Sequence, residues 1–180
     1  VIDFPINETR DLFETLGTIV SDGAVITDMG SSKKRSAAWA EEFLPNTVSY
    51  VGGRPIIKVQ LEGVAAASGN LFEGVNYCVI PSKSADDQAT KTVVGLAESI
   101  GAKPYFLDVD EHDSYSAAMN NLPYLISTAF VNATAGTESW REMHKSAGNL
   151  FNMQSSLSAN DPTDVEADSL TMSEPLVYWV

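Results

Sequence analysis

The segment that decides the fold is Ala24-Val25-Ile26-Thr27-Asp28-Met29-Gly30-Ser31-Ser32-Lys33, an apolar run that ends in Asp28 and turns through Gly30 into a polar stretch. The pattern predicts a strand over residues 24–28 and a helix over residues 32–43. Ser31 is expected to cap that helix, with backbone amides facing whatever lies above the sheet. In open α/β folds this edge is where ligands bind, although an ordinary helix cap explains the motif equally well.

The same alternation continues on both sides of this segment. Strands are predicted over residues 1–4, 48–51, 76–80 and 104–107, and helices over residues 8–20 and 86–100, the latter closed by Gly101. The first of these helices is expected to bury one face, which carries Leu12, Phe13, Leu16 and Ile19. Strands separated by helices of this length indicate a largely parallel sheet covered by helices.

The pattern changes after Asp108, where helices are predicted over residues 111–120, 123–135, 138–148 and 163–180. Residues 148–161 read as a loop or an interrupted helix. We therefore expect a division near Asp108 into residues 1–108 and residues 109–180. Because the chain starts at Val1 without methionine and ends in a helix-like stretch, we also expect it to be a piece of a longer protein.

Composition excludes several classes of partner. Of the 180 residues, 24 are acidic and 11 basic, which gives a formal net charge of -13. A surface with this much negative charge repels phosphate backbones and anionic lipids. Neither nucleic acid nor a membrane is therefore an expected partner. The one cysteine, Cys78, excludes an internal disulfide and fits a cytoplasmic protein. With no Cys/His cluster, no metal site is predicted.

Several motifs occur in a fixed order along the chain. They are Asp28-Met29-Gly30-Ser31-Ser32-Lys33, Gly52-Gly53-Arg54-Pro55, Glu62-Gly63, Leu71-Phe72-Glu73-Gly74, Asp110-Glu111-His112-Asp113, Asn121-Leu122-Pro123-Tyr124 and Ser158-Ala159-Asn160-Asp161-Pro162. No single motif is specific, but their succession resembles the prephenate and arogenate dehydrogenase family of tyrosine biosynthesis, and the resemblance covers nearly the whole chain.

The resemblance implies an α/β fold, the C-terminal half of a Rossmann-like nucleotide-binding domain, followed by an all-α dimerisation domain. It further implies an oxidoreductase that oxidatively decarboxylates an anionic substrate, prephenate or arogenate, with NAD or NADP, and that forms a homodimer. The family's Gly-x-Gly-x-x-Gly fingerprint is expected to precede Val1. Leu122, Leu125, Ile126, Phe130 and Val131 fall at helical spacing, which suits a dimer interface or core packing within the chain.

The resemblance also implies site residues. It assigns Ser31, Arg54 and Asn121 to catalysis, Pro5, Asp28, Gly30 and Ser31 to the cofactor, and Arg54, Lys58, Tyr124 and Ser156 to the substrate. Such a substrate needs a basic pocket in an acidic protein, for which Lys33, Lys34, Arg35, Arg54 and Lys58 are candidates. Arg141 and Lys145 are further candidates to compensate for a missing basic group.

The sequence departs from the family at catalytic positions. Arg54 replaces the histidine of Gly-Gly-His-Pro, and a guanidinium binds a carboxylate but cannot accept a proton. Asn121 and Tyr124 replace both histidines of His-Leu-Pro-His, and Ser156 falls where the family carries an arginine. Arg54 could instead be a surface residue after a glycine turn, and Tyr124 a core aromatic.

Only two histidines are present, His112 and His144, and both are predicted to be exposed, with Asp110 or Asp113 capping the helix at His112. Three hypotheses remain open. A working dehydrogenase predicts Arg54 directed into a crevice above Ser31, whereas a catalytically silent relative predicts Arg54 turned to solvent or to Glu62. A dimerisation module predicts a protected sheet edge at Val1.

Overall fold

The computed structural model describes residues 1–57, 67–159 and 173–180 of the chain. These residues form two compact units, Val1–Asp113 and Ser114–Val180, which we describe separately. The boundary between the units falls inside helix α4 (Val109–Ser116). The division into domains at Asp108 stays a prediction.

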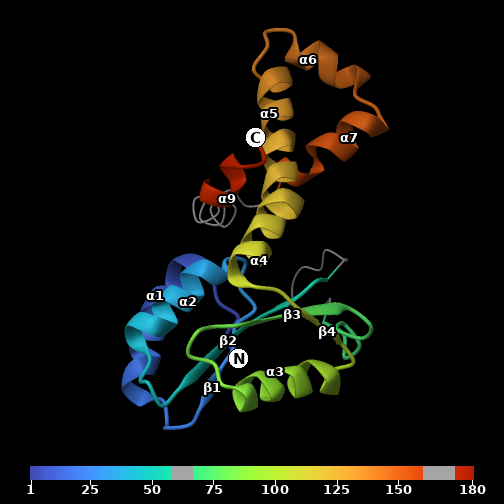
Figure 1. The fold of residues 1–180 in the computed structure, drawn as a ribbon. Helices are drawn as coiled ribbons and strands as arrows, with labels where there is room; N and C mark the ends of the chain where they lie inside the picture. Colours follow the sequence, from blue (N-terminus) through green and yellow to red (C-terminus); the bar gives the residue numbers. More distant parts are fainter. Residues whose placement is uncertain (58–66, 160–172) are drawn as a thin grey trace. The chain divides into compact units, whose positions relative to one another are not determined.

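The first unit alternates strands and helices, as the sequence predicts. Its elements are α1 (Ile6–Ile19), β1 (Val25–Ile26), α2 (Lys33–Phe43), β2 (Ser49–Pro55), β3 (Asn76–Pro81), α3 (Asp87–Ser99) and β4 (Lys103–Phe106). The first predicted strand, residues 1–4, is reduced to one parallel bridge between Ile2 and Asp28. Figure 1 shows these elements in blue to green.

The four strands form one mixed sheet in the order β1-β2-β3-β4. β1 pairs with β2 in parallel, and so does β3 with β4, but β2 and β3 are antiparallel. The expected largely parallel sheet is therefore wrong at its centre. Only a parallel neighbour requires a crossover connection, and no helical pattern was recognised between β2 and β3 to supply one.

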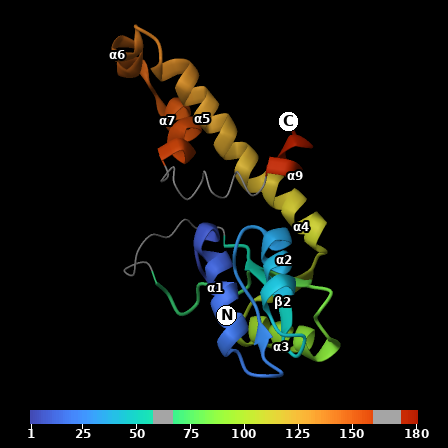
Figure 2. The ribbon, with the colours of Figure 1, turned by 90° about the vertical axis from the view of Figure 1, so that its left-hand side faces the viewer.

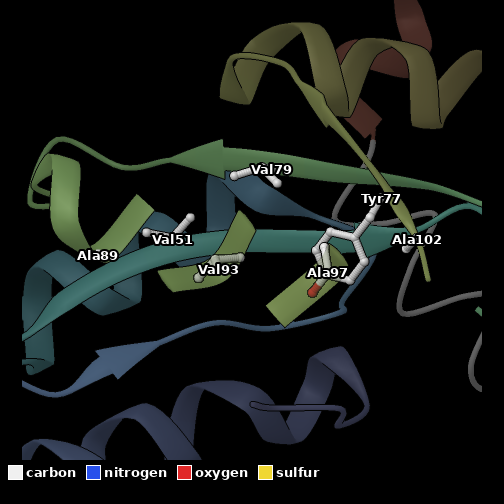
Figure 3. Packing of buried hydrophobic residues seen from close by; sticks show 7 residues of the cluster. All are labelled: Val51, Tyr77, Val79, Ala89, Val93, Ala97 and Ala102. Carbon is white, nitrogen blue, oxygen red and sulfur yellow. The ribbon is translucent and has the colours of Figure 1, made fainter. Parts of the chain in front are cut away.

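The two faces of the sheet carry separate hydrophobic clusters because neighbouring residues of a strand point to opposite sides. Val51 packs with Val79 and with residues of α3, among them Val93, on one face (Figure 3). Tyr50 packs on the other face with Phe13 of α1 and Ala40 of α2. Helices thus cover both faces, with α3 on one side and α1 and α2 on the other.

Strand β2 extends to Pro55, beyond the predicted end at Val51, so Gly52, Gly53 and Arg54 are strand residues rather than a turn. Their pairing with β3 keeps this segment extended; Arg54, for example, lies opposite Cys78. A Cβ on Gly53 would collide with the Tyr77 hydroxyl, and one on Gly52 would lie 2.9 Å from Lys33 Cδ. Close packing of side chains from neighbouring elements explains both glycines.

Both ends of α3 follow from residues close by in the sequence, and Gly101 closes the helix as predicted. Asp86 caps α3 by accepting a hydrogen bond from the Ala89 amide at 2.6 Å, and Gly101 follows the helix with a positive φ of 77°. On α1, Phe13 is buried and Leu12 and Leu16 pack against the same cluster. Ile19 is 70% exposed, contrary to the prediction, because it is the last residue of the helix and lies beyond the packed surface.

Replacing Gly17 by alanine is expected to lower the free energy of unfolding by about 1–3 kcal/mol, because a Cβ there would overlap the Phe43 carbonyl oxygen where α1 meets α2. The matched control is Gly95→Ala in α3, where nothing lies within 4 Å. That exchange is expected to stabilise the protein by up to about 1 kcal/mol. Urea unfolding measures both, and equal effects would contradict the close approach of α1 and α2.

The second unit is helical. After α4, a π-helical turn at Ala117–Asn121 leads into α5 (Leu122–Ala135), so the two predicted helices are continuous. Then follow α6 (Trp140–Met143), a 3₁₀ turn at His144–Ser146, α7 (Asn149–Ser155), a 3₁₀ turn at Ser156–Ala159, and α9 (Ser173–Val177). Figure 2 shows α7 lying along α5.

Two helix predictions in this unit need correction. The helix expected over residues 138–148 is split, with α6 ending at Met143. Of the segment 148–161, the described residues 148–159 contain a short interrupted helix, which is one of the two predicted alternatives. The terminal helix ends at Val177 rather than continuing to Val180, and residues 163–172 of that prediction lie outside the described residues. Within the described ranges, every helix is too short or too polar to cross a membrane.

Candidate active site at the carboxyl end of the first strand

A buried carboxylate, Asp28, is the centre of the polar cluster that follows β1. Its Oδ1 lies 2.7 Å from Lys33 Nζ and accepts a hydrogen bond from Tyr50 Oη at 2.6 Å. Its Oδ2 accepts hydrogen bonds from Ser36 Oγ at 3.1 Å and from the Gly30 amide at 3.3 Å. Three hydrogen bonds and one ion pair thus compensate the desolvation of one fully buried acid.

Burial dominates the protonation of the groups around Asp28. It lowers the pKa of Lys33, whose side chain is entirely inaccessible, while the Asp28 charge acts in the opposite direction. Burial and then the Asp28 charge raise the pKa of Tyr50 well above its ordinary value. Tyr50 is therefore a neutral donor at physiological pH. Lys33, a predicted supplier of a basic pocket, is instead an internal partner of Asp28.

A second carboxylate, Asp113, caps helix α2 from outside. Its Oδ1 accepts from the Lys33 amide at 2.8 Å, and its Oδ2 accepts from the Lys34 amide at 3.0 Å and from Ser32 Oγ at 3.1 Å. The residue at the N-cap position is Ser32, not Ser31 as predicted, and its side chain makes no capping bond. The prediction that Ser31 caps α2 was wrong because the cap comes from Asp113, a residue distant in the sequence.

The capping predictions at His112 were also wrong. Asp108, rather than Asp110 or Asp113, accepts from the Glu111 amide at 2.8 Å. His112 itself is buried at 3% exposure instead of exposed, because its Nδ1 lies 2.8 Å from Asp113 Oδ1 within the first unit. His144 is exposed, as predicted.

Burial sets the charge of His112, and hydrogen bonds set that of Asp113. Burial lowers the pKa of His112 below its usual 6.5, against the opposing hydrogen bond to Asp113, so the imidazole is neutral at pH 7. Burial alone would raise the pKa of Asp113, but hydrogen bonds from His112 and from the Lys33 and Lys34 amides outweigh it and hold the pKa below 3.8. The pair is a neutral imidazole and an ionised carboxylate.

The fold is expected to lose stability as the pH falls below about 6.5, because unfolded His112 then binds a proton that the folded state excludes. The loss grows by at most about 1.4 kcal/mol per pH unit until the lower folded pKa is reached. Thermal unfolding between pH 7.5 and about pH 5 measures it. His112→Asn should flatten this slope, whereas the exposed His144→Asn should leave it unchanged.

The Arg54 side chain reaches the loop between the two carboxylates. Its Nη1 donates a hydrogen bond to the Ser31 carbonyl oxygen at 2.9 Å, and the residue is half-buried. Strand β2 therefore places a permanent positive charge at the loop that follows β1. The guanidinium is thus directed toward Ser31, while the crevice predicted above Ser31 stays a prediction and Glu62 lies outside the described residues.

The structure brings together some of the predicted site residues and not others. Asp28, Gly30, Ser31 and Arg54 lie in one cluster. Pro5 is exposed immediately before α1, at the same edge of the sheet, since Ile2 pairs with Asp28 in parallel. Lys58 lies outside the described residues. The assignment of roles to these residues stays a prediction.

The remaining predicted site residues belong to the second unit. Asn121 is buried at the end of the π-helical turn, a type of irregularity common at functional sites. Tyr124 is half-buried on α5, and Ser156 is exposed, with its hydroxyl donating to the Met153 carbonyl at 2.9 Å. Leu125 and Ile126 are exposed on α5.

The cluster does not have the order of a nucleophilic triad. Ser32 donates to Asp113 rather than to His112, so no base is placed to activate its hydroxyl. Among the residues that the structure describes, no group of three or more His, Cys, Asp or Glu side chains is arranged to hold a metal ion. The geometry instead offers hydrogen-bond donors and a fixed guanidinium.

Comparisons with known proteins define the class. A family model described as "Prephenate dehydrogenase, nucleotide-binding domain" matches residues 1–106. The first unit is thus part of a Rossmann-like nucleotide-binding domain, followed by a helical portion. The prephenate dehydrogenase of Bacillus subtilis is 29% identical over 139 residues, which cover 77% of this chain and 38% of that protein. The enzyme of Lactococcus lactis is 29% identical over 133 residues, which are 73% of this chain and 36% of that protein.

Solved structures agree with this class. The prephenate dehydrogenase from A. aeolicus, in complex with hydroxyphenyl propionate and NAD+, has a TM-score of 0.88 and 25% identity, over 98% of this chain and 61% of that one. A Synechocystis arogenate dehydrogenase shares the fold, with a TM-score of 0.82 and 23% identity over 98% of this chain and 63% of that one. The chain belongs to the prephenate dehydrogenase family, and spans well under half the length of the curated relatives it matches.

Sequence reasoning missed three members of the cluster. Tyr50 and Ser36 were read only as parts of a strand and a helix, and Asp113 as a local helix cap. The sequence offered one signal, polar residues at positions that lie next to apolar, core-forming residues. That signal does not indicate which distant partner satisfies each group.

Proposed function

We propose that this chain is part of an NAD(P)-dependent dehydrogenase that oxidatively decarboxylates prephenate or arogenate in tyrosine biosynthesis. The observation that carries the proposal is the contact between Arg54 and the Ser31 carbonyl, within a chain that belongs to the prephenate dehydrogenase family. It holds a guanidinium at the edge of the sheet where α/β folds bind ligands. The curated relatives bear the name prephenate dehydrogenase.

In this proposal Arg54 anchors a substrate carboxylate. A guanidinium presents donors in a planar fork that matches a carboxylate, and the hydrogen bond from Nη1 to the Ser31 carbonyl restricts the direction of the guanidinium. Ser31 is proposed to hydrogen-bond the substrate beside it. Asn121 is proposed as a catalytic residue, and Lys58, Tyr124 and Ser156 as substrate-binding residues.

The residues present fit one part of a dinucleotide site. The parallel pairing of Ile2 with Asp28 brings Pro5 and Gly30 to one edge, and a Cβ on Gly30 would meet only Asp28 Oδ2, so a flat group can approach this backbone closely. Pro5, Gly30 and Ser31 would hold the cofactor there, with Asp28 as a support through the Gly30 amide. NAD or NADP, when bound, supplies the hydride acceptor.

A second candidate is a catalytically silent relative that binds ligand or forms a dimer. The observation that favours it is Arg54 itself, because a guanidinium cannot take the proton that the family's histidine accepts from the ring hydroxyl. His112 does not replace that base, since it is buried and hydrogen-bonded to Asp113. A homodimer through the helical unit is proposed in either case, supported by exposed apolar residues such as Ile126.

The test is an assay of NAD+ and NADP+ reduction with prephenate and with arogenate, together with calorimetric titration with hydroxyphenyl propionate. The proposal predicts turnover that depends on one of the two substrates, about 10²–10⁴-fold slower than a histidine-containing homologue assayed in parallel. Saturable binding without any turnover would favour the silent relative. If the protein shows neither binding nor turnover, the result contradicts both the dehydrogenase and a silent relative that binds this ligand.

A further inference from the structure

We infer that Asp113 is a positioning residue for the anion site at Arg54, and that His112 directs the Asp113 carboxylate. The inference rests on the proposed function for the identity of the anion that Arg54 binds. The role of Asp113 in holding the loop rests on the geometry of the first unit alone. The inference concerns two buried residues of α4, His112 and Asp113. Asp113 is hydrogen-bonded to Ser32 in the loop after β1, and His112 is hydrogen-bonded to Asp113.

The first step is that Asp113 does the work of an N-cap residue for α2. This helix has no acidic residue in its first turn and no capping bond from its own Ser32. Asp113, eighty residues away in sequence, accepts from two of the first amides of the helix, those of Lys33 and Lys34. A carboxylate there also complements the positive end of the helix dipole.

The second step is that the loop lies between two carboxylates. Asp28 accepts from the Gly30 amide at one end, and Asp113 accepts from the Ser32 hydroxyl at the other. Ser31 lies between these two anchors, and its carbonyl accepts from Arg54 Nη1. Without Asp113 the loop would lose the side-chain anchor at Ser32, so the direction of the Ser31 carbonyl would be less constrained.

The third step concerns His112. The Asp113 oxygens accept four hydrogen bonds in total, two on each oxygen, which uses the acceptor capacity of an ionised carboxylate. The neutral His112 provides one of the four through Nδ1, so its proton lies on that nitrogen. This bond fixes the rotation of the carboxylate and, with it, the two oxygens that meet the helix amides.

Asp113→Asn tests the inference, because the amide nitrogen cannot accept from one of the two capped amides. The matched control is Asp110→Asn, the same charge change on the same helix at a side chain that is 84% exposed. The dissociation constant of hydroxyphenyl propionate is expected to rise about tenfold in Asp113→Asn and less than about twofold in Asp110→Asn. An unchanged constant in Asp113→Asn would overturn the inference.

A double-variant cycle separates positioning from general loss of structure. If Asp113 acts through Arg54, then Asp113→Asn should change the dissociation constant by less than about twofold in an Arg54→Ala background. An equal loss in both backgrounds would show a merely structural role and would overturn the inference. Should Asp113→Asn fail to fold, His112→Asn, which retains a donor, and His112→Leu, which does not, form the second pair, with loss expected only for leucine.

A readout without ligand distinguishes failure of the inference from failure of the proposed function. Hydrogen exchange at the Lys33 and Lys34 amides, and the NMR signal of the Arg54 guanidinium, report the loop directly. In Asp113→Asn the two amides are expected to exchange faster and the guanidinium signal to change. In Asp110→Asn neither is expected to change. If the wild-type protein does not bind hydroxyphenyl propionate, the proposed function fails, while these signals still decide the role of Asp113.

Discussion

Replacing Asp28 by asparagine is expected to lower the free energy of unfolding by about 3–5 kcal/mol, because it leaves the buried Lys33 ammonium without a carboxylate. Lys33 would have to remain as a buried, uncompensated charge or give up its proton in the folded state, and either outcome favours unfolding. Denaturant unfolding at pH 7 measures the loss. The Tyr50 and Ser36 hydroxyls would also lose an ionised acceptor.

The control for this prediction removes both charges. The double variant Asp28→Asn/Lys33→Met replaces the ion pair by a neutral amide and an apolar chain of similar length. It is expected to be more stable than Asp28→Asn alone, since replacing both partners of a buried pair commonly costs little. A double variant that is as unstable as the single one would show that the hydrogen bonds of Asp28, rather than the charge of Lys33, dominate its role.

Replacing Arg54 by alanine is expected to raise the KM for the anionic substrate about tenfold to a hundredfold. This factor corresponds to the loss of one charged hydrogen bond to a carboxylate. The guanidinium is half-buried and directed by the Ser31 carbonyl, so its loss removes a fixed partner rather than one of many mobile charges. If turnover is undetectable, the same change is expected in the dissociation constant of hydroxyphenyl propionate.

Two further variants sharpen the Arg54 prediction. Arg54→Lys keeps the charge but loses the planar fork, and is expected to recover only part of the affinity. Arg10→Ala removes the same charge from α1, where Arg10 lies near Glu42 and over the Phe43 ring, and should leave the KM within about twofold of wild type. A KM that is equally insensitive to both alanine variants would contradict the role of Arg54 as a substrate anchor.

Local sequence signals predicted the elements of this fold well where the signal and its cause lie close together in the chain. The glycine that closes α3, Gly101, needs only its own neighbours, and this prediction was confirmed. Alternation of apolar segments identified the strands and helices of the first unit. The same reasoning was wrong about the end of β2, because the pairing with β3 keeps Gly52 and Gly53 extended.

The candidate site was predicted only in part. Ordered motifs placed Asp28, Gly30, Ser31 and Arg54 in one functional group, and the structure brings these four residues together. The same motifs included Lys33 and His112, but as a supplier of a basic pocket and an exposed imidazole. Both are buried in the structure, each beside a carboxylate that is close by in the sequence. The burial itself depends on how the elements pack, which local spacing does not reveal.

By itself, the sequence determined the class of fold, the family resemblance and the residues at the end of β1, because periodicity, turn residues and ordered motifs depend on neighbouring positions. Only the tertiary structure decided the antiparallel centre of the sheet, the burial of Lys33 against Asp28, and the capping of α2 by Asp113. A buried polar group must find a partner wherever the fold supplies one, and that partner can lie eighty residues away.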